Sequence, residues 1–230
     1  MRAIVTGGAS GIGAAICARL SAAGLEVETL DVVSGFDVTR PDHWERVGPV
    51  DVACLNAGVV TGETDVAALS DEAYRRAVGV NVDGVVFGVR RLARVMPRGG
   101  RIVATASLAG LTALPDDPVY TLTKHAVVGF VRSVAPQLAA RGISINAVCP
   151  GIADTPLLSP EAKAGFEAAG FPLLRAEEVA GAVWLALESG ETGHAWAVQP
   201  GREPVDFRFP RVPGPRGPGG ESYPPPPSFA

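Results

Sequence analysis

Three residues of this 230-residue chain carry side chains that could transfer a proton at one site: Ser107, Tyr120 and Lys124. Tyr120 and Lys124 are four positions apart, so on a helix they share one face and the ammonium can lie beside the phenol. A free tyrosine loses its proton only near pH ~10, so a tyrosine that acts as a base near neutral pH needs a nearby cation. The Tyr-x-x-x-Lys spacing also occurs on solvated helix faces, and a second signal is therefore required.

A glycine-rich turn near the start of the chain supplies that signal. The apolar run 2–6 is followed by Gly7, Gly11 and Gly13, and then by helical apolar spacing over 14–23. Glycines permit a tight turn and close approach of a pyrophosphate, while the N-terminus of the helix offers free N–H groups and a positive dipole end. This strand, turn and helix predict a dinucleotide site.

Further motifs follow in order along the chain. Asn56-Ala57-Gly58 comes after the apolar run 50–55, Ser107 follows the run 101–106, and Pro150-Gly151 follows the run 143–148. With Asn81 and Thr155, this order resembles the classical, single-domain branch of the short-chain dehydrogenase/reductase family over residues 2–199. The resemblance implies a catalytic tetrad of Asn81, Ser107, Tyr120 and Lys124. Together with the glycine turn, it assigns cofactor contacts to Gly7, Ser10, Gly11, Ile12, Gly13, Asp31, Asp37, Val38, Asn56, Ala57, Gly58, Tyr120, Lys124, Pro150, Gly151, Ile152 and Thr155.

The resemblance also implies a role for each catalytic residue. Tyr120 would take the proton of a secondary alcohol while a hydride passes to the nicotinamide, and Ser107 would hold the substrate oxygen. Lys124 would lower the pKa of Tyr120 and bind the nicotinamide ribose, and Asn81 would hold a water that links Lys124 to solvent. We therefore expect an NAD-dependent alcohol dehydrogenase or ketoreductase that acts on CH-OH groups.

The choice of NAD rests on Asp31, at the end of the second apolar run. A carboxylate there accepts hydrogen bonds from the adenosine ribose and repels a 2′-phosphate, and no Arg or Lys follows it in Val32-Val33. An NADP-preferring ketoreductase remains the alternative. Asp37-Val38 resembles the family's adenine-contacting pair, while Asp37 could equally start a turn or cap a helix before Pro41.

Composition limits the class of protein. A chain with 47% hydrophobic residues can bury one core, and a net charge of −4 offers no basic stripe for nucleic acid or an anionic membrane. No apolar run approaches the ~18 residues that span a bilayer, and the first strand leaves no room for a signal peptide, so we expect a cytoplasmic protein. The three cysteines and three histidines lack metal-ligand spacing, so no metal site is expected.

Alternating strand and helix patterns predict an α/β fold, a Rossmann-like doubly wound parallel sheet in a single domain. A whole crossover helix is expected between strands two and three, yet only Ser34-Gly35 separates Val33 from the Asp37 segment, so this helix and the third strand are shortened or missing. The predicted strands are 2–6, 25–31, 50–55, 101–106, 143–148 and 194–199, and the predicted helices are 11–23, 65–78, 81–96, 118–140, 156–168 and 176–188.

Two regions divide the chain: a catalytic domain over 1–203 and a Pro/Gly-rich tail over 204–230. Its prolines predict that the tail forms neither helix nor sheet ladder. It is either a disordered or polyproline II tail, or a strap over a neighbouring subunit or the substrate opening. The strap's predicted anchors are Phe207, Phe209, Tyr223 and Phe229.

The predicted partners are a small secondary alcohol or ketone and further copies of the chain. Apolar residues at the family's substrate lid suggest an apolar substrate, although core packing explains them equally: Leu157, Leu158, Phe166, Phe171 and Leu174. Asp116-Asp117 could line the opening of the site, but a solvated turn that caps the next helix is preferred. Apolar faces on helices 81–96 and 118–140 predict a homodimer or homotetramer. The less favoured classes are a regulatory protein without turnover and an epimerase or dehydratase.

Overall fold

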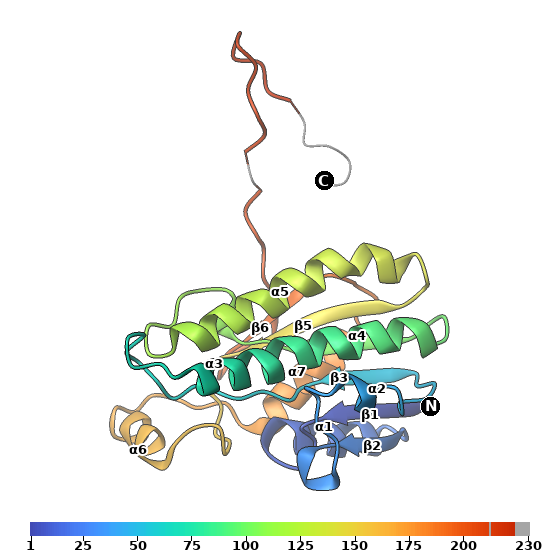
Figure 1. Ribbon diagram of the computed structural model, residues 1–230, viewed down its shortest axis with the longest axis vertical. Coiled ribbons are helices and arrows are strands. Elements are labelled where there is room, and N and C mark those ends of the chain that lie inside the picture. Colours follow the sequence, from blue (N-terminus) through green and yellow to red (C-terminus); the bar gives the residue numbers. More distant parts are fainter. Residues whose placement is uncertain (212, 224–230) are drawn as a thin grey trace.

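In the computed structural model, which describes residues 1–211 and 213–223, seven strands form one sheet in the order β2-β1-β3-β4-β5-β6-β7 (Figure 1). The first six strands pair in parallel and β7 joins β6 antiparallel. The predicted parallel α/β sheet is confirmed. The strands are β1 (Arg2–Thr6), β2 (Glu26–Leu30), β3 (Val52–Leu55), β4 (Arg101–Thr105), β5 (Ser144–Pro150), β6 (Ala195–Val198) and β7 (Val205–Asp206).

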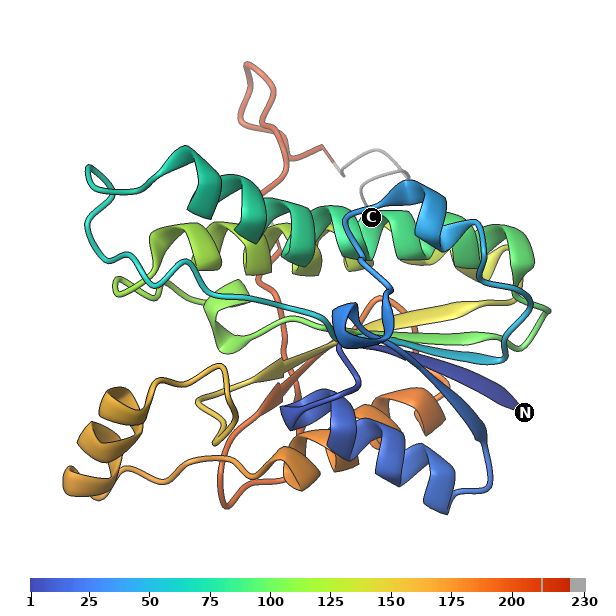
Figure 2. The ribbon, with the colours of Figure 1, turned by 60° about the horizontal axis from the view of Figure 1, so that its bottom comes forward.

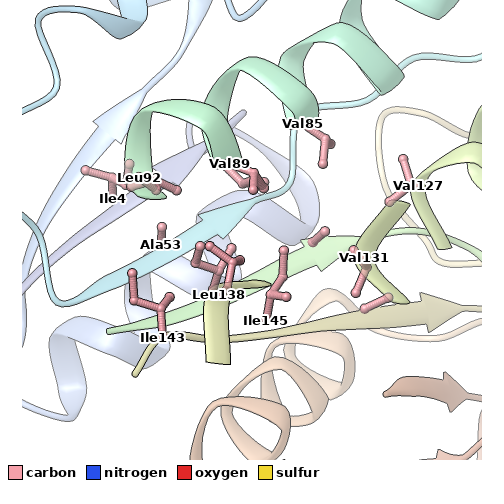
Figure 3. Packing of buried hydrophobic residues seen from close by; sticks show 14 of the residues in the cluster. Ile4, Ala53, Val85, Val89, Leu92, Val127, Val131, Leu138, Ile143 and Ile145 are labelled. Atoms are coloured by element: carbon pink, nitrogen blue, oxygen red, sulfur yellow. The ribbon is translucent and has the colours of Figure 1, made fainter. Parts of the chain in front are cut away.

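Helices cover both faces of the sheet, as Figure 2 shows. One layer contains α1 (Gly11–Ala22) and α7 (Ala176–Glu188), and the other contains α2 (Pro41–Trp44), α3 (Asp71–Val78), α4 (Gly84–Val95) and α5 (Pro118–Ala139). The helix α6 (Pro160–Ala168) stands beside the carboxyl end of the sheet. Two apolar clusters fill the layers, and in the larger one α4 and α5 pack on the central strands (Figure 3). These buried faces hold the strand ends in fixed relative positions.

The crossover from β2 to β3 is shortened, as the sequence predicts. Residues 31–51 contain a 3₁₀ turn at Val32–Ser34 and the four-residue helix α2, and no strand. Trp44 fills the space that a longer crossover helix would cover, and it is 1% exposed. Its Nε1 donates to the Val38 carbonyl at 2.9 Å, and its ring packs edge to face with Phe36. As a result β2 is the edge strand, and its exposed Glu26 and Glu28 disfavour pairing with another sheet.

Several predicted boundaries move in the structure. The helix predicted from 65 begins at Asp71, where Ser70 caps it by accepting from Ala73 N–H, and the one predicted from 156 begins at Pro160. A π-helical turn, Gly79–Asp83, joins α3 to α4, so Asn81 lies in that turn instead of a new helix. Single-sequence periodicity does not detect such a turn because its apolar spacing differs only locally from that of an α-helix.

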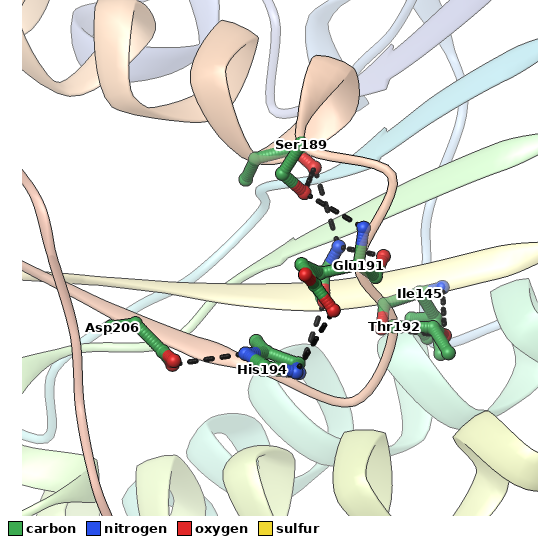
Figure 4. Close-up of polar contacts among 8 residues, drawn as sticks. Ile145, Ser189, Glu191, Thr192, His194 and Asp206 are labelled. Atoms are coloured by element: carbon green, nitrogen blue, oxygen red, sulfur yellow. Dashed lines mark hydrogen bonds and ion pairs between the residues drawn. The ribbon is translucent and has the colours of Figure 1, made fainter.

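The prediction that the tail forms no sheet ladder is wrong at its first residues. Val205 and Asp206 form β7 and pair with Ala197 and Trp196. Polar contacts support the pairing: His194 Nδ1 lies 3.1 Å from an Asp206 carboxylate oxygen, and its Nε2 lies 3.4 Å from Glu191 (Figure 4). The chain turns back after β6, so that β7 runs antiparallel to it. The many prolines of the tail gave no indication of this pairing in the sequence.

Beyond β7 the tail leaves the body of the molecule, as Figure 1 shows. Phe207 and Phe209 still pack against the core, and the guanidinium of Arg132 on α5 lies 3.7 Å from the Phe209 ring centroid. Tyr223 is exposed, and Phe229, the last predicted anchor, lies outside the described residues. The first two aromatic anchors therefore pack on the body of this chain, Phe209 against Arg132 of α5 and Phe207 against the Phe209 ring.

Candidate active site

The carboxyl ends of the parallel strands open into a cleft of about 700 Å³. Most of the predicted residues meet there because they follow the ends of strands that share one edge of the sheet, while Tyr120 and Lys124 reach the cleft from α5. Gly13 and Asn81 lie beside the cleft without lining it. The predicted residues that line it are Gly7, Ser10, Gly11, Ile12, Asp31, Asp37, Val38, Asn56, Ala57, Gly58, Ser107, Tyr120, Lys124, Pro150, Gly151, Ile152 and Thr155.

The glycine turn between β1 and α1 leaves no room for side chains. Gly7 has φ +64°, and a Cβ there would lie 2.9 Å from the Ala57 Cα atom. A Cβ at Gly13 would overlap the Gly7 carbonyl and lie 2.8 Å from Asn56 Nδ2. Ser10 is the N-cap residue of α1 but makes no side-chain cap hydrogen bond. The turn therefore has the form of a cradle in which a phosphate could approach backbone N–H groups, and these residues fit a dinucleotide.

Asp31 combines a structural contact with a place in the cleft wall. One carboxylate oxygen accepts from Val33 N–H at 3.2 Å, and the other accepts from Ala9 N–H at 3.1 Å, which ties the end of β2 to the glycine turn. Asp37 accepts from Thr39 N–H at 2.9 Å, as a residue that starts a turn does. It also lines the cleft, where an adenine could contact it. Among the described residues that line the cleft, Lys124 is the only cation.

Ser107 and Tyr120 form the centre of the site. Both side chains line the cleft, and the Ser107 hydroxyl donates to the Pro150 carbonyl at 3.5 Å and accepts from Ala109 N–H at 3.1 Å. Tyr120 is 9% exposed, and burial raises its pKa above the usual value of 10.0. The nearby Ser107 side chain acts in the opposite direction, and the negative charge of Asp117 adds to the rise in the pKa.

Lys124 lies beneath this pair, with 3% of its surface exposed. Its Nζ donates to the Thr105 carbonyl at 2.9 Å and lies 5.4 Å from the centroid of the Tyr120 ring. In the protein without dinucleotide, burial of the phenol sets the direction of the shift, so the pKa of Tyr120 lies above its usual value although the ammonium is near. Burial also lowers the pKa of Lys124 itself, from 10.5 to about 8.

The low pKa of Lys124 predicts a pH-dependent cost in stability. Since the folded-state pKa of about 8 lies below the ordinary 10.5, the cost is fully present below pH 8 and disappears as the pH rises towards 10.5. Lys124→Met removes the cost of the buried charge but also the hydrogen bond to the Thr105 carbonyl, which is worth about 1 kcal/mol. The net result should be a rise of about 2 kcal/mol in the free energy of unfolding of the cofactor-free protein at pH 7. Urea denaturation at pH 7 and pH 10 measures the free energy of unfolding. The prediction is contradicted if the variant and the wild type differ by the same amount at both pH values.

Asn81 holds the segment after β3 against the catalytic helix. Its Oδ1 accepts from Val59 N–H at 2.8 Å, and its Nδ2 donates to the Val59 carbonyl at 2.8 Å and to Thr123 Oγ at 3.0 Å. A Cβ at Gly58 would lie 3.3 Å from Lys124 Nζ and 3.5 Å from Asn81 Oδ1. The absence of a side chain at position 58 therefore keeps the space above the ammonium open, where a ribose hydroxyl or a water could bind.

Asp117 is a residue whose position the sequence does not reveal in full. The N-cap prediction is confirmed, since Oδ1 accepts from Tyr120 N–H at 2.8 Å, but the solvated turn is wrong because Asp117 is only 6% exposed. Its Oδ2 reaches the segment after β3 and accepts from Thr61 N–H at 2.8 Å and from Gly62 N–H at 3.3 Å. Asp-Pro before a helix signals the cap, but no local pattern signals a partner more than 50 residues away.

The lid residues divide into two groups. Leu157, Leu158 and Phe171 line the cleft, and Phe171 is 46% exposed, as expected of a wall that meets a ligand. Leu174 is 1% exposed and belongs to the core, so for this residue the packing interpretation is confirmed. Phe166 contacts Phe171 with ring centroids 5.4 Å apart and supports it from α6.

Other classes of site find no support in the part of the chain that the structure describes. No three His, Cys, Asp or Glu side chains gather there as metal ligands would. No helix within residues 1–211 and 213–223 is long and apolar enough to cross a membrane.

A parallel sheet whose first strand leads through a glycine cradle into a helix defines the class of Rossmann-like dinucleotide-binding proteins. A family model described as enoyl-(acyl carrier protein) reductase matches residues 41–201. A 3beta-hydroxysteroid dehydrogenase 2 from Eggerthella lenta is 35% identical over 185 residues, 66% of this chain and 71% of that protein. The chain belongs to the short-chain dehydrogenase/reductase family.

Two further relatives extend the comparison. A 3beta-hydroxysteroid dehydrogenase from Mediterraneibacter gnavus is 36% identical over 150 residues, 63% of this chain, and the match spans 54% of the relative's length. The crystal structure of a short-chain dehydrogenase from Burkholderia cenocepacia in complex with NADP superposes with a TM-score of 0.73 at 26% identity, covering 86% of this chain and 95% of the other. Relatives of this family bind a nicotinamide dinucleotide, and the NADP complex leaves the choice between the two cofactors open.

Proposed function

We propose that the protein is an NAD(H)-dependent oxidoreductase that interconverts a secondary alcohol and a ketone. The observation that carries the proposal is the presence of Ser107, Tyr120 and the buried Lys124 together in one cleft, which begins at the glycine cradle. The test is a panel of secondary alcohols with NAD and of ketones with NADH, followed by nicotinamide absorbance. No turnover across the panel with either NAD or NADP would overturn it.

Each catalytic side chain has one task in this proposal. Ser107 donates to the substrate oxygen and holds it near the phenol, and Tyr120 accepts the alcohol proton in the oxidation direction or returns it in reduction. Lys124 and Asn81, together with the space above Gly58, bind the nicotinamide ribose and a water through which the proton reaches solvent. A nicotinamide held by these residues would supply the hydride acceptor for oxidation, and its positive charge would favour the phenolate of Tyr120.

Asp31 supports NAD over NADP. Its carboxylate lines the cleft, and no cation among the lining residues at this end could pair with a 2′-phosphate. NAD should bind at least roughly tenfold more tightly than NADP, a difference of about 1.4 kcal/mol, and Asp31→Ala should narrow the gap. Calorimetric titration of both dinucleotides measures this. Equal affinities for wild type would refute the NAD assignment and favour the NADP-preferring alternative.

The wall of the cleft supports a neutral, apolar substrate. Its substrate end is lined by aliphatic and aromatic side chains: Val59, Val60, Leu108, Leu114, Leu157, Leu158 and Phe171. The charged lining residues of the whole cleft are three aspartates, Asp31, Asp37 and Asp117, and the buried Lys124. An anionic substrate would meet these carboxylates without a free cation. The panel should therefore contain matched pairs, such as 4-phenyl-2-butanone and its para-carboxylate, with the neutral ketone turned over at least about tenfold more efficiently.

Assembly into a homodimer or homotetramer is also proposed, through α4 and α5. Leu122 on α5 is 52% exposed, and Phe87 on α4 and Phe130 on α5 are only partly buried. Light scattering at micromolar concentration should show an oligomer, and a monomer would refute this. Removal of residues 211–230 leaves β7 in place, and it should weaken the assembly or raise the substrate KM only if the tail is a strap.

A further inference from the structure

The carboxylate of Asp117 connects two parts of the cleft wall that are far apart in sequence. Oδ1 accepts from the N–H of Tyr120 at 2.8 Å, inside the first turn of α5. Oδ2 accepts from the N–H groups of Thr61 and Gly62 at 2.8 and 3.3 Å. A helix cap needs only the first of these bonds, so the other two go beyond the ordinary function of an N-cap residue.

The segment 59–62 depends on such side-chain contacts. It follows β3 but belongs to no strand or helix, and its backbone is held by Asn81 at Val59, by Arg76 Nη at the Val60 carbonyl, 3.1 Å, and by Asp117 at its far end. Val59 and Val60 line the cleft. Loss of the Asp117 contacts would therefore loosen the wall against which a substrate packs.

Asp117 also contributes charge. It is 6% exposed, and its described hydrogen-bond partners are backbone N–H groups, which do not neutralise the carboxylate. The charged and titratable groups near the Tyr120 side chain are Asp117 at the start of α5, Lys124 on the same helix and Cys149 on β5, and the Ser107 hydroxyl lines the same cleft. The negative charge of Asp117 favours the neutral phenol over the phenolate.

We infer that Asp117 is a positioning residue that fixes the 59–62 segment against the catalytic helix and holds a negative charge beside Tyr120. It thereby controls both how an alcohol packs in the cleft and the pH at which the phenol loses its proton. This inference rests on the proposed function for its kinetic consequences. Its structural part, the link between Asp117 and the N–H groups of Thr61 and Gly62, is independent of any substrate.

Two substitutions separate the helix cap at Tyr120 from the hydrogen bonds to Thr61 and Gly62. In Asp117→Ser, the hydroxyl still caps the N–H of Tyr120 but is too short to reach residue 61. In Asp117→Asn, the amide keeps the size of the side chain and removes the charge. Its NH₂ group is itself a donor, so it cannot accept from the backbone N–H groups that it faces. The control is Asp116→Ser, which removes the same charge from an exposed neighbour. Thermal unfolding confirms that each variant is folded.

The first readout is hydrogen exchange of the full-length protein without substrate. Protection of the amides of Thr61 and Gly62 should fall at least about tenfold in both Asp117 variants and stay unchanged in Asp116→Ser. Unchanged protection in the Asp117 variants would overturn the link. This result stands whether or not the protein turns over an alcohol, so a failure of the proposed function is recognised separately, by an inactive wild type.

The second readout is the pH dependence of kcat and KM for the best alcohol of the panel. Both Asp117 variants should move the rise of kcat with pH to lower values by about 1 pH unit and raise KM about fivefold or more, with Asp116→Ser like wild type. A residue that only caps the helix would lower stability without moving the pH profile. A pH profile and a KM equal to those of the control would overturn the inference.

Discussion

Tyr120→Phe should retain dinucleotide binding and lose turnover by about 10²-fold or more. The substitution removes only the phenolic oxygen, and the ring remains to fill its 9%-exposed place on α5. Because burial raises the pKa of Tyr120, the oxidation rate of the wild type should also increase with pH as the phenolate forms, and the variant should lack this increase. NADH fluorescence titration and steady-state kinetics measure the two effects.

The matched control for this variant is Tyr74→Phe, which removes the same oxygen from a tyrosine on α3 that is 42% exposed. It should behave as wild type in both assays. Near-normal turnover by Tyr120→Phe would eliminate the proposed acid/base role. A loss of NADH binding as large as the loss of turnover would instead mean that the variant damages the cleft.

Gly13→Ala should weaken dinucleotide binding by at least about 10²-fold, which corresponds to a loss of about 2.7 kcal/mol of binding free energy. The added methyl group would overlap the Gly7 carbonyl and press on Asn56 Nδ2, which lies 2.8 Å from the Cβ position. Since these are backbone and tightly bonded atoms, the turn must move, and overpacking of this kind lowers the free energy of unfolding by about 1–3 kcal/mol. Calorimetric titration and urea denaturation measure both quantities.

Gly181→Ala on α7 is the control for a glycine in a helix. Position 181 is exposed and a Cβ there would meet no atom within 4 Å, so this variant should bind the dinucleotide normally and gain about 0.5–1 kcal/mol of stability. If Gly13→Ala bound NAD as tightly as wild type, the glycine turn would not be the phosphate cradle that we propose.

The residues of the cleft could be predicted because the chemistry follows the topology. Gly7, Asn56 and Ser107 stand directly after apolar runs, and in a parallel sheet the ends of those runs converge. The shortened crossover was equally visible, since the segment around Ser34-Gly35 is too short for a helix and a further strand. Tyr120 and Lys124 lie on a helix instead, and the family resemblance implied their place beside the strand ends.

What the sequence did not reveal depends on contacts between distant residues. The carboxylate of Asp117 has a local partner, which the Asp-Pro pattern predicts, and a distant one, which it does not. The sequence shows the spacing of Lys124 from Tyr120 but not the depth of burial, which raises the pKa of the phenol in the protein without dinucleotide. The short strand β7 was missed for a related reason: its pairing is decided by the exposed edge of β6.

That pairing has a consequence for how the chain reaches its folded state. During synthesis β6 emerges before β7, so for the time needed to make residues 199–206 the edge of β6 carries unpaired N–H and C=O groups. An unfinished chain is then open to pairing with a second unfinished chain, and the exposure ends when Val205 and Asp206 close the ladder and Phe209 stacks on Arg132. The start of the tail therefore completes the sheet at β6 and reduces the edge left unpaired to the short strand β7.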